Sequence, residues 1–174
     1  MRHKSIIGID PAFRKDGFHI CILQDKQVSF YVFEIYEDFI VWLVTQKEYN
    51  SSNTIFSVEN SNSQNVSFKR AGADSIGAQL CISRKAGKNQ AVSEGCLRIL
   101  KKRGFEVVDI SPKQKGSKLT DAYFRAIMRS NGHTLLEGQY KGLKKEQDKI
   151  DAYQIAEIAE RQQRAQILKP YSHA

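Results

Sequence analysis

The fold is decided by residues 5–23, SIIGIDPAFRKDGFHICIL, in which a short apolar run ends in one carboxylate, Asp10, followed directly by Pro11. The run is typical of a buried strand. From Phe18 onward, apolar residues recur with the two-residue period of a second strand. A strand that ends in an acid has either reached solvent or delivers that acid to a site, and the rest of the chain decides between these interpretations.

The apolar periods along the chain predict five strands and four helices. The strands cover residues 5–10, 18–23, 28–32, 54–58 and 106–110. The helices cover 89–103, 119–131 and 148–168, after a first helix that we expect Asp38 to cap. A hairpin meander followed by strand–helix crossovers predicts an α/β fold with a five-stranded mixed sheet flanked by helices.

The length of 174 residues, with 41% hydrophobic residues, fits a single domain over 1–174 with one core. Residues 61–87 are rich in Ser, Asn, Gly and basic side chains. A connection of this length is unusual in a compact domain, so we expect a functional loop there that contacts the substrate.

Basic residues outnumber acidic ones by 27 to 19, which gives a formal net charge of +8. They gather in clusters at 69–70, 84–88, 101–103, 113–118 and 141–149. Clustered positive charge favours a polyanionic partner such as nucleic acid. The alternative is that these are solvated helix ends that serve only solubility.

The three cysteines, Cys21, Cys81 and Cys96, are odd in number and lack metal-ligand spacing. They predict buried free thiols in a reducing compartment. The N-terminus has no signal-peptide pattern, and the longest apolar run, 39–44, is too short to cross a membrane. We therefore expect a cytoplasmic protein without a membrane partner.

Four acids are candidates for one metal site. Asp10 and Glu59 end predicted strands, and Asp148 and Asp151 lie three residues apart on one helix face. Each alone has a simpler explanation as a turn, a solvated strand end or a helix cap. Together, four carboxylates in a basic protein match two divalent ions, and oxygen ligands favour Mg²⁺ or Mn²⁺. Such a pair of ions is suited to phosphodiester hydrolysis.

The segments GIDPAFRKDG, VEN and DKIDAYQIA resemble motifs of the RuvC Holliday junction resolvases, a family of the ribonuclease H-like superfamily. The resemblance implies a ribonuclease H-like fold and assigns the metal-binding acids to Asp10, Glu59, Asp148 and Asp151. It also implies a Mg²⁺-dependent endonuclease that resolves four-way DNA junctions, with two ions per site and Mn²⁺ as a substitute.

The resemblance extends to VVDISPKQKGSKLTDAYFRAIM, where the family's phosphate-binding lysines fall on Lys113 and Lys118, and Lys118 is expected to act in catalysis. Two departures stand out. Ala12 replaces the family's usual Gly, and residues 61–87 are longer than the family's connection. Family members insert an aromatic residue from this region into the junction, and Phe68 is the nearest candidate here; it could equally be a core anchor.

The basic residues next to Phe68, Lys69 and Arg70, are expected to bind phosphates, as are Arg84 and Lys85. Paired symmetric nicks imply a homodimer. The helix at 89–103 is the candidate interface, because Cys96 and Leu97 border its apolar stripe. The alternative is that this face packs on the protein's own sheet.

Three other functions stay open. The chain could be a ribonuclease H-like nuclease that acts on RNA or other branched DNA, or a catalytically silent nucleic-acid-binding module of the same fold. The GID strand end followed by a turn and Gly17 also resembles the phosphate hairpin of actin-like and sugar-kinase ATPases. Those enzymes clamp nucleotide between two domains, whereas we expect one domain here.

Overall fold

The computed structural model describes residues 5–12, 17–63 and 76–167. Its strands are β1 (Ser5–Asp10), β2 (Phe18–Gln24), β3 (Gln27–Phe33), β4 (Thr54–Glu59), β5 (Glu106–Ile110) and β6 (Thr134–Leu135). Its helices are α1 (Tyr36–Thr45), α2 (Ile76–Lys102), α3 (Pro112–Lys115), α4 (Asp121–Ser130) and α5 (Leu143–Ile167), with a 3-10 turn η1 (Ser61–Ser63).

The strands form one six-stranded mixed sheet in the order β5-β4-β1-β2-β3-β6. The meander β1-β2-β3 is antiparallel, whereas β4 lies parallel to both β1 and β5. The predicted α/β fold with a mixed sheet flanked by helices is confirmed. The predicted strand number of five was wrong, because β6 adds a two-residue parallel edge along Gln27 and Val28 that is too short to show a period.

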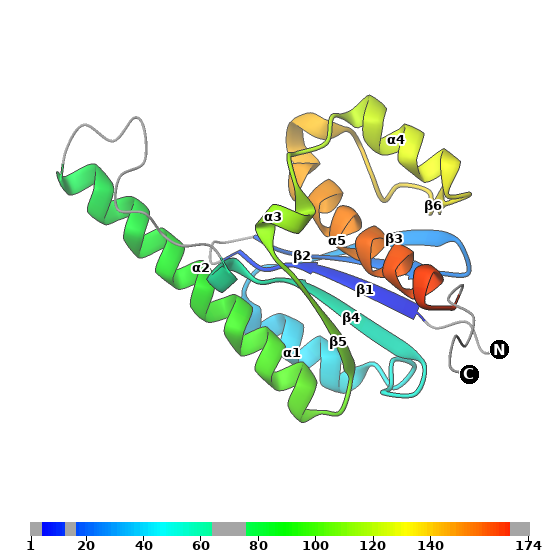
Figure 1. Ribbon diagram of the computed structural model, residues 1–174, viewed down its shortest axis with the longest axis horizontal. Coiled ribbons are helices and arrows are strands. Elements are labelled where there is room, and N and C mark those ends of the chain that lie inside the picture. Colours follow the sequence, from blue (N-terminus) through cyan, green and yellow to red (C-terminus); the bar gives the residue numbers. More distant parts are fainter. Residues whose placement is uncertain (1–4, 13–16, 64–75, 168–174) are drawn as a thin grey trace, which may run out of the picture.

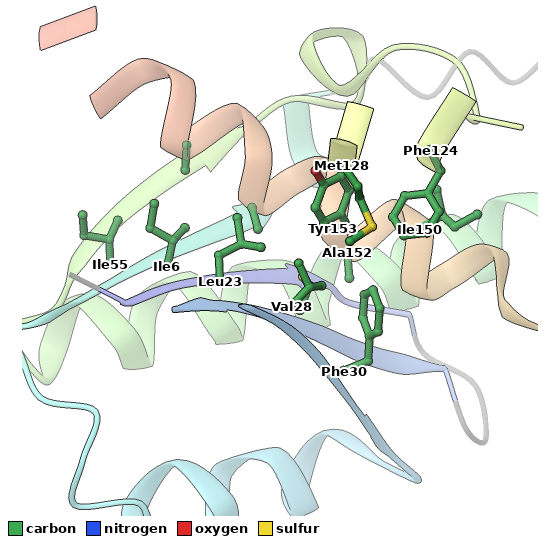
Figure 2. Packing of buried hydrophobic residues seen from close by; sticks show 13 residues of the cluster. Ile6, Leu23, Val28, Phe30, Ile55, Phe124, Met128, Ile150, Ala152 and Tyr153 are labelled. Carbon is green, nitrogen blue, oxygen red and sulfur yellow. The ribbon is translucent and has the colours of Figure 1, made fainter. Parts of the chain in front are cut away.

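Helices cover both faces of the sheet, with α5 and α4 on one side and α1 and α2 on the other (Figure 1). Alternate residues of β1 therefore enter different cores: Ile6 packs in the α5 layer, whereas Ile7 and Ile9 pack in the α1–α2 layer. Figure 2 shows the first of these cores, in which Tyr153 lies over the strand residues Leu23 and Val28 and Phe124 packs edge-on against Tyr153.

Gly8 lets α5 lie against β1 at backbone distance. A Cβ atom at this position would stand 2.3 Å from the carbonyl oxygen of Ala152 and 2.5 Å from the amide nitrogen of Ala156. The small residues of α5 therefore meet a strand residue without a side chain. This contact fixes how α5 lies along the central strand.

The starts of α1 and α5 differ from the prediction. α1 begins at Tyr36 with Ile35 at the N-cap, so Asp38 lies inside the first turn, where its carboxylate accepts a hydrogen bond from the Ile35 amide at 3.4 Å. α5 begins at Leu143, before the predicted Asp148, and contains one non-helical residue, Glu146. The periodic pattern marked only the part of α5 that packs on the sheet.

α2 is the largest departure from expectation. It begins at Ile76 rather than at Asn89, so residues 76–87 are helical and not a loop. Its first turns extend beyond the edge of the sheet (Figure 1). η1 contacts it further along, where the side-chain amide of Asn62 donates to the carbonyl oxygen of Gln90 at 3.3 Å. The helix therefore consists of a packed half and a projecting half.

The apolar stripe of α2 packs on the protein's own sheet. Cys96 is fully buried and Leu97 is 7% exposed, and both belong to the core beneath α1 and α2. The expectation that they border an interface is therefore wrong. Of the cysteines, Cys21 and Cys96 are buried as predicted, whereas Cys81 on the projecting half is exposed; all three are free thiols.

Candidate metal centre

Two parallel strands place Asp10 and Glu59 side by side. β1 and β4 are paired up to Ile9 and Val58, and each acid is the next and last residue of its strand. Gly8, two residues before Asp10, contacts α5, and Ser57, two residues before Glu59, donates its hydroxyl to a backbone carbonyl of α5 at 3.0 Å. Because strand side chains alternate, both acids lie on the face that α5 covers.

The helix α5 supplies the other two acids. Carboxylate oxygens of Asp10, Asp148 and Asp151 all lie within 4.8 Å of one another. Asp151 is buried, with 3% of its surface exposed, and Asp148 is half-buried one turn earlier. The three predicted aspartates thus converge, while Glu59 stands beside them and contacts a lysine.

That lysine is Lys115, at the end of α3. Its Nζ atom lies 2.5 Å from Oε2 of Glu59 and 3.3 Å from Oδ2 of Asp151, and its side chain is only 11% exposed. The sequence indicated a basic cluster at 113–118 and favoured Lys113 and Lys118. The inward residue was missed because α3 is four residues long and shows no period.

Charge is unbalanced in this cluster. Burial is the main reason that the pKa of Asp10 rises to about 7. The positive charge of Lys115 lowers this pKa, whereas the nearby carboxylates, Glu59 above all, raise it further. Burial acts against the charged form of Lys115, yet Asp10, Glu59 and Asp151 outweigh burial and raise its pKa above the usual range. A hard divalent cation with oxygen ligands fits Asp10, Asp148 and Asp151, because it would neutralise carboxylates that otherwise repel one another.

Two glutamines of α5, neither of them predicted from the sequence, hold the cluster in place. The side-chain amide of Gln147 donates to Oδ1 of Asp151 at 2.8 Å, and that of Gln154 donates to the carbonyl oxygen of Lys115 at 2.5 Å. The spacing of four between Gln147 and Asp151 is a detectable signal on a helix. The contact from Gln154 joins distant segments and left no such signal.

The residues expected to bind phosphate lie in two different parts of the described structure. Lys113 and Lys118 are exposed on either side of Lys115, and Arg84 and Lys85 are exposed on α2. Phe68, Lys69 and Arg70 lie outside the described residues.

Within the described part of the chain, no helix has both the length and the apolar character needed to span a bilayer.

No protein-family model matches the chain. No curated protein matches it by sequence. Among solved structures, the chain is similar to RuvC of T. thermophilus in complex with Holliday junction substrate. The identity is 13%, the TM-score is 0.47, and the match covers 88% of this chain and 90% of that chain.

Proposed function

We propose that this protein is a divalent-metal-dependent endonuclease that resolves four-way DNA junctions by paired symmetric nicks. The observation that carries the proposal is the convergence of Asp10, Asp148 and Asp151 at the end of a central strand, in a chain with a net charge of +8. The choice of a junction as substrate rests on the motifs of the sequence.

The three aspartates would hold Mg²⁺, for which Mn²⁺ can substitute. The bound metal supplies an activated water and stabilises the negative charge that develops on the phosphate. Glu59 and Lys115 form the adjoining ion pair and would orient the acids around the scissile phosphate. Burial of this cluster keeps its charges only partly screened by water.

The DNA-contacting surface is assigned to basic side chains near this edge of the sheet. Lys113 and Lys118 flank the inward Lys115, and both are exposed to a phosphate backbone. Arg84 and Lys85 on α2 would hold a second segment of the DNA. The assignment of Phe68 to the junction centre, with Lys69 and Arg70 binding phosphates beside it, is a proposal from the sequence.

Two nicks of like polarity require two metal centres, and one chain offers the one described above. We therefore propose a homodimer, since two-fold symmetry would give both sites the same relation to the junction. Sedimentation on junction DNA and end-labelling of each strand test this. A dimer that nicks two opposed strands is expected, and a monomer that nicks one strand contradicts it.

The function is tested with a panel of a four-way junction, a flap, a linear duplex and an RNA–DNA hybrid, each with Mg²⁺ or EDTA. Cleavage of the junction in Mg²⁺ alone, and its loss in Asp151→Asn with DNA binding retained, is the expected result. Preferred cleavage of the hybrid or flap would instead indicate another ribonuclease H-like nuclease. Binding without any cleavage would indicate a silent nucleic-acid-binding module.

A further inference from the structure

A buried cation of the chain's own already lies among the four acids. Nζ of Lys115 contacts one carboxylate oxygen of Glu59 and one of Asp151. The lysine is held from its backbone as well, because Gln154 donates to its carbonyl oxygen and Ser111 caps α3 by accepting from the Gln114 amide. These contacts hold the backbone of Lys115 at the edge of the acid cluster.

The four acids surround two positions at which a cation can lie. Asp10, Asp148 and Asp151 bring their oxygen atoms within 4.8 Å of one another, and among the described residues Glu59 is not a member of this group. Glu59 instead belongs with Asp151 around the ammonium of Lys115. Asp151 is shared between the two positions. A second divalent ion between Glu59 and Asp151 would have to compete with Lys115, which contacts Oε2 of Glu59 and Oδ2 of Asp151.

We propose that each chain binds one divalent ion, at Asp10, Asp148 and Asp151, and that Lys115 serves as the second cation in place of a second metal. This inference rests on the proposed metal-dependent function. It replaces the two ions that four carboxylates suggest by their number alone. Nζ of Lys115 already lies against Glu59 and Asp151 in the fold, so the lysine is an effective competitor for Glu59.

The test is the number of Mn²⁺ ions bound per chain, measured by equilibrium dialysis and calorimetry with the metal alone. The wild-type protein is expected to bind one ion. Lys115→Met should bind two, and its first ion on the order of tenfold more tightly, because a neighbouring positive charge is gone. Lys47→Met removes an exposed lysine before the amino end of β4, away from the acids at the carboxyl ends of the strands, and should still bind one ion with unchanged affinity. Asp10→Asn should bind the ion much more weakly.

Wild-type protein that binds two ions per chain would overturn the inference, whatever the variants do. A single ion in folded Lys115→Met would overturn it as well. Lys115→Gln, which keeps a hydrogen-bond donor beside Glu59 without the charge, provides the same test if the methionine variant does not fold. Junction cleavage is scored separately: one bound ion without cleavage refutes the nuclease proposal alone, whereas two ions with cleavage refute only the role of Lys115.

Discussion

Asp10 ends the central strand in surroundings that oppose its own charge. Burial and neighbouring carboxylates raise its pKa from 3.8 to about 7. The folded protein therefore holds this proton more tightly than the unfolded chain does. The stability that the protonated group contributes is fully present below about pH 4 and is lost as the pH rises towards 7.

Asp10→Asn should accordingly be more stable than the wild type in EDTA at about pH 8, by on the order of several degrees in Tm. The two proteins should differ little well below pH 3.8, where Asp10 is protonated in both states. Added Mg²⁺ should stabilise the wild type and leave the variant unchanged. Thermal unfolding by circular dichroism measures all three. A variant less stable than the wild type in EDTA at the higher pH would contradict the assignment.

Glu160 shows the opposite shift at the other end of α5. Burial raises its pKa, but hydrogen bonds from His133, Lys26 and Arg164 outweigh burial and lower it from 4.5 to about 2. Lys26 lies in the turn between β2 and β3, His133 directly precedes β6, and Arg164 lies one turn further along α5. Their nitrogen atoms lie 3.0, 3.1 and 2.6 Å from oxygen atoms of Glu160, in that order. One carboxylate thus joins three segments.

Glu160→Gln should lower the free energy of unfolding at neutral pH by on the order of 2 kcal/mol after allowance for solvent screening. Because the folded pKa is depressed, this contribution is present above 4.5 and is lost as the pH falls towards 2. The difference in free energy of unfolding between wild type and variant, measured with urea, should therefore shrink to zero as the pH falls from 4.5 towards 2. Glu94→Gln, at an exposed position of α2, is the control and should show no such difference. A difference in free energy of unfolding that stays constant with pH would refute the role of the Glu160 charge.

At the scale of elements, the contact between β1 and α5 determines where the metal centre forms. Gly8 allows the approach, and the acids of both elements lie just beyond it. Gly8→Ala should destabilise the fold by about 1–3 kcal/mol or more, because the added methyl group meets backbone atoms that cannot move independently. It should also weaken Mn²⁺ binding, since α5 must shift away from Asp10. Urea unfolding and calorimetry measure the two effects.

The matched control is Gly95→Ala in α2. A Cβ atom there meets the Tyr36 side chain, whose hydroxyl oxygen is the nearest atom at 3.5 Å, an ordinary contact. Alanine in a helix is favoured over glycine by roughly 1 kcal/mol, so this variant should be as stable as the wild type or more so. Equal stability of Gly8→Ala and Gly95→Ala would show that α5 does not depend on the close approach.

For the whole molecule, the net charge of +8 predicts that DNA binding weakens steeply with salt. Each phosphate contact contributes about −0.9 to the slope of log affinity against log salt. Arg84→Gln on α2 should reduce the slope by about one contact. Lys47→Gln is the control, because this exposed residue precedes the amino end of β4, whereas the acids lie at the carboxyl ends. Equal slopes for both variants in fluorescence anisotropy titrations would argue against α2 as a DNA-binding surface.

Local sequence predicts the order of the main strands and helices, the strand-end positions of Asp10 and Glu59 and the spacing of Asp148 and Asp151 on one helix face. Strand periodicity and the acids that end β1 and β4 are local features, and parallel strands bring their carboxyl ends to one edge wherever they pair. The spacing of Asp148 and Asp151 is likewise set by one helix turn. These features need no knowledge of distant contacts.

Tertiary contacts select the lysine that enters the acid cluster, and they set how far α2 extends and which of its faces is covered. Lys113, Lys115 and Lys118 are equivalent in sequence, and a four-residue helix shows no period that would orient them. Lys115 is selected because Gln154, from a segment 39 residues away, holds its backbone and because Glu59 and Asp151 attract its charge. Contacts between residues so far apart leave no mark on local composition, so they become visible only once the chain has folded.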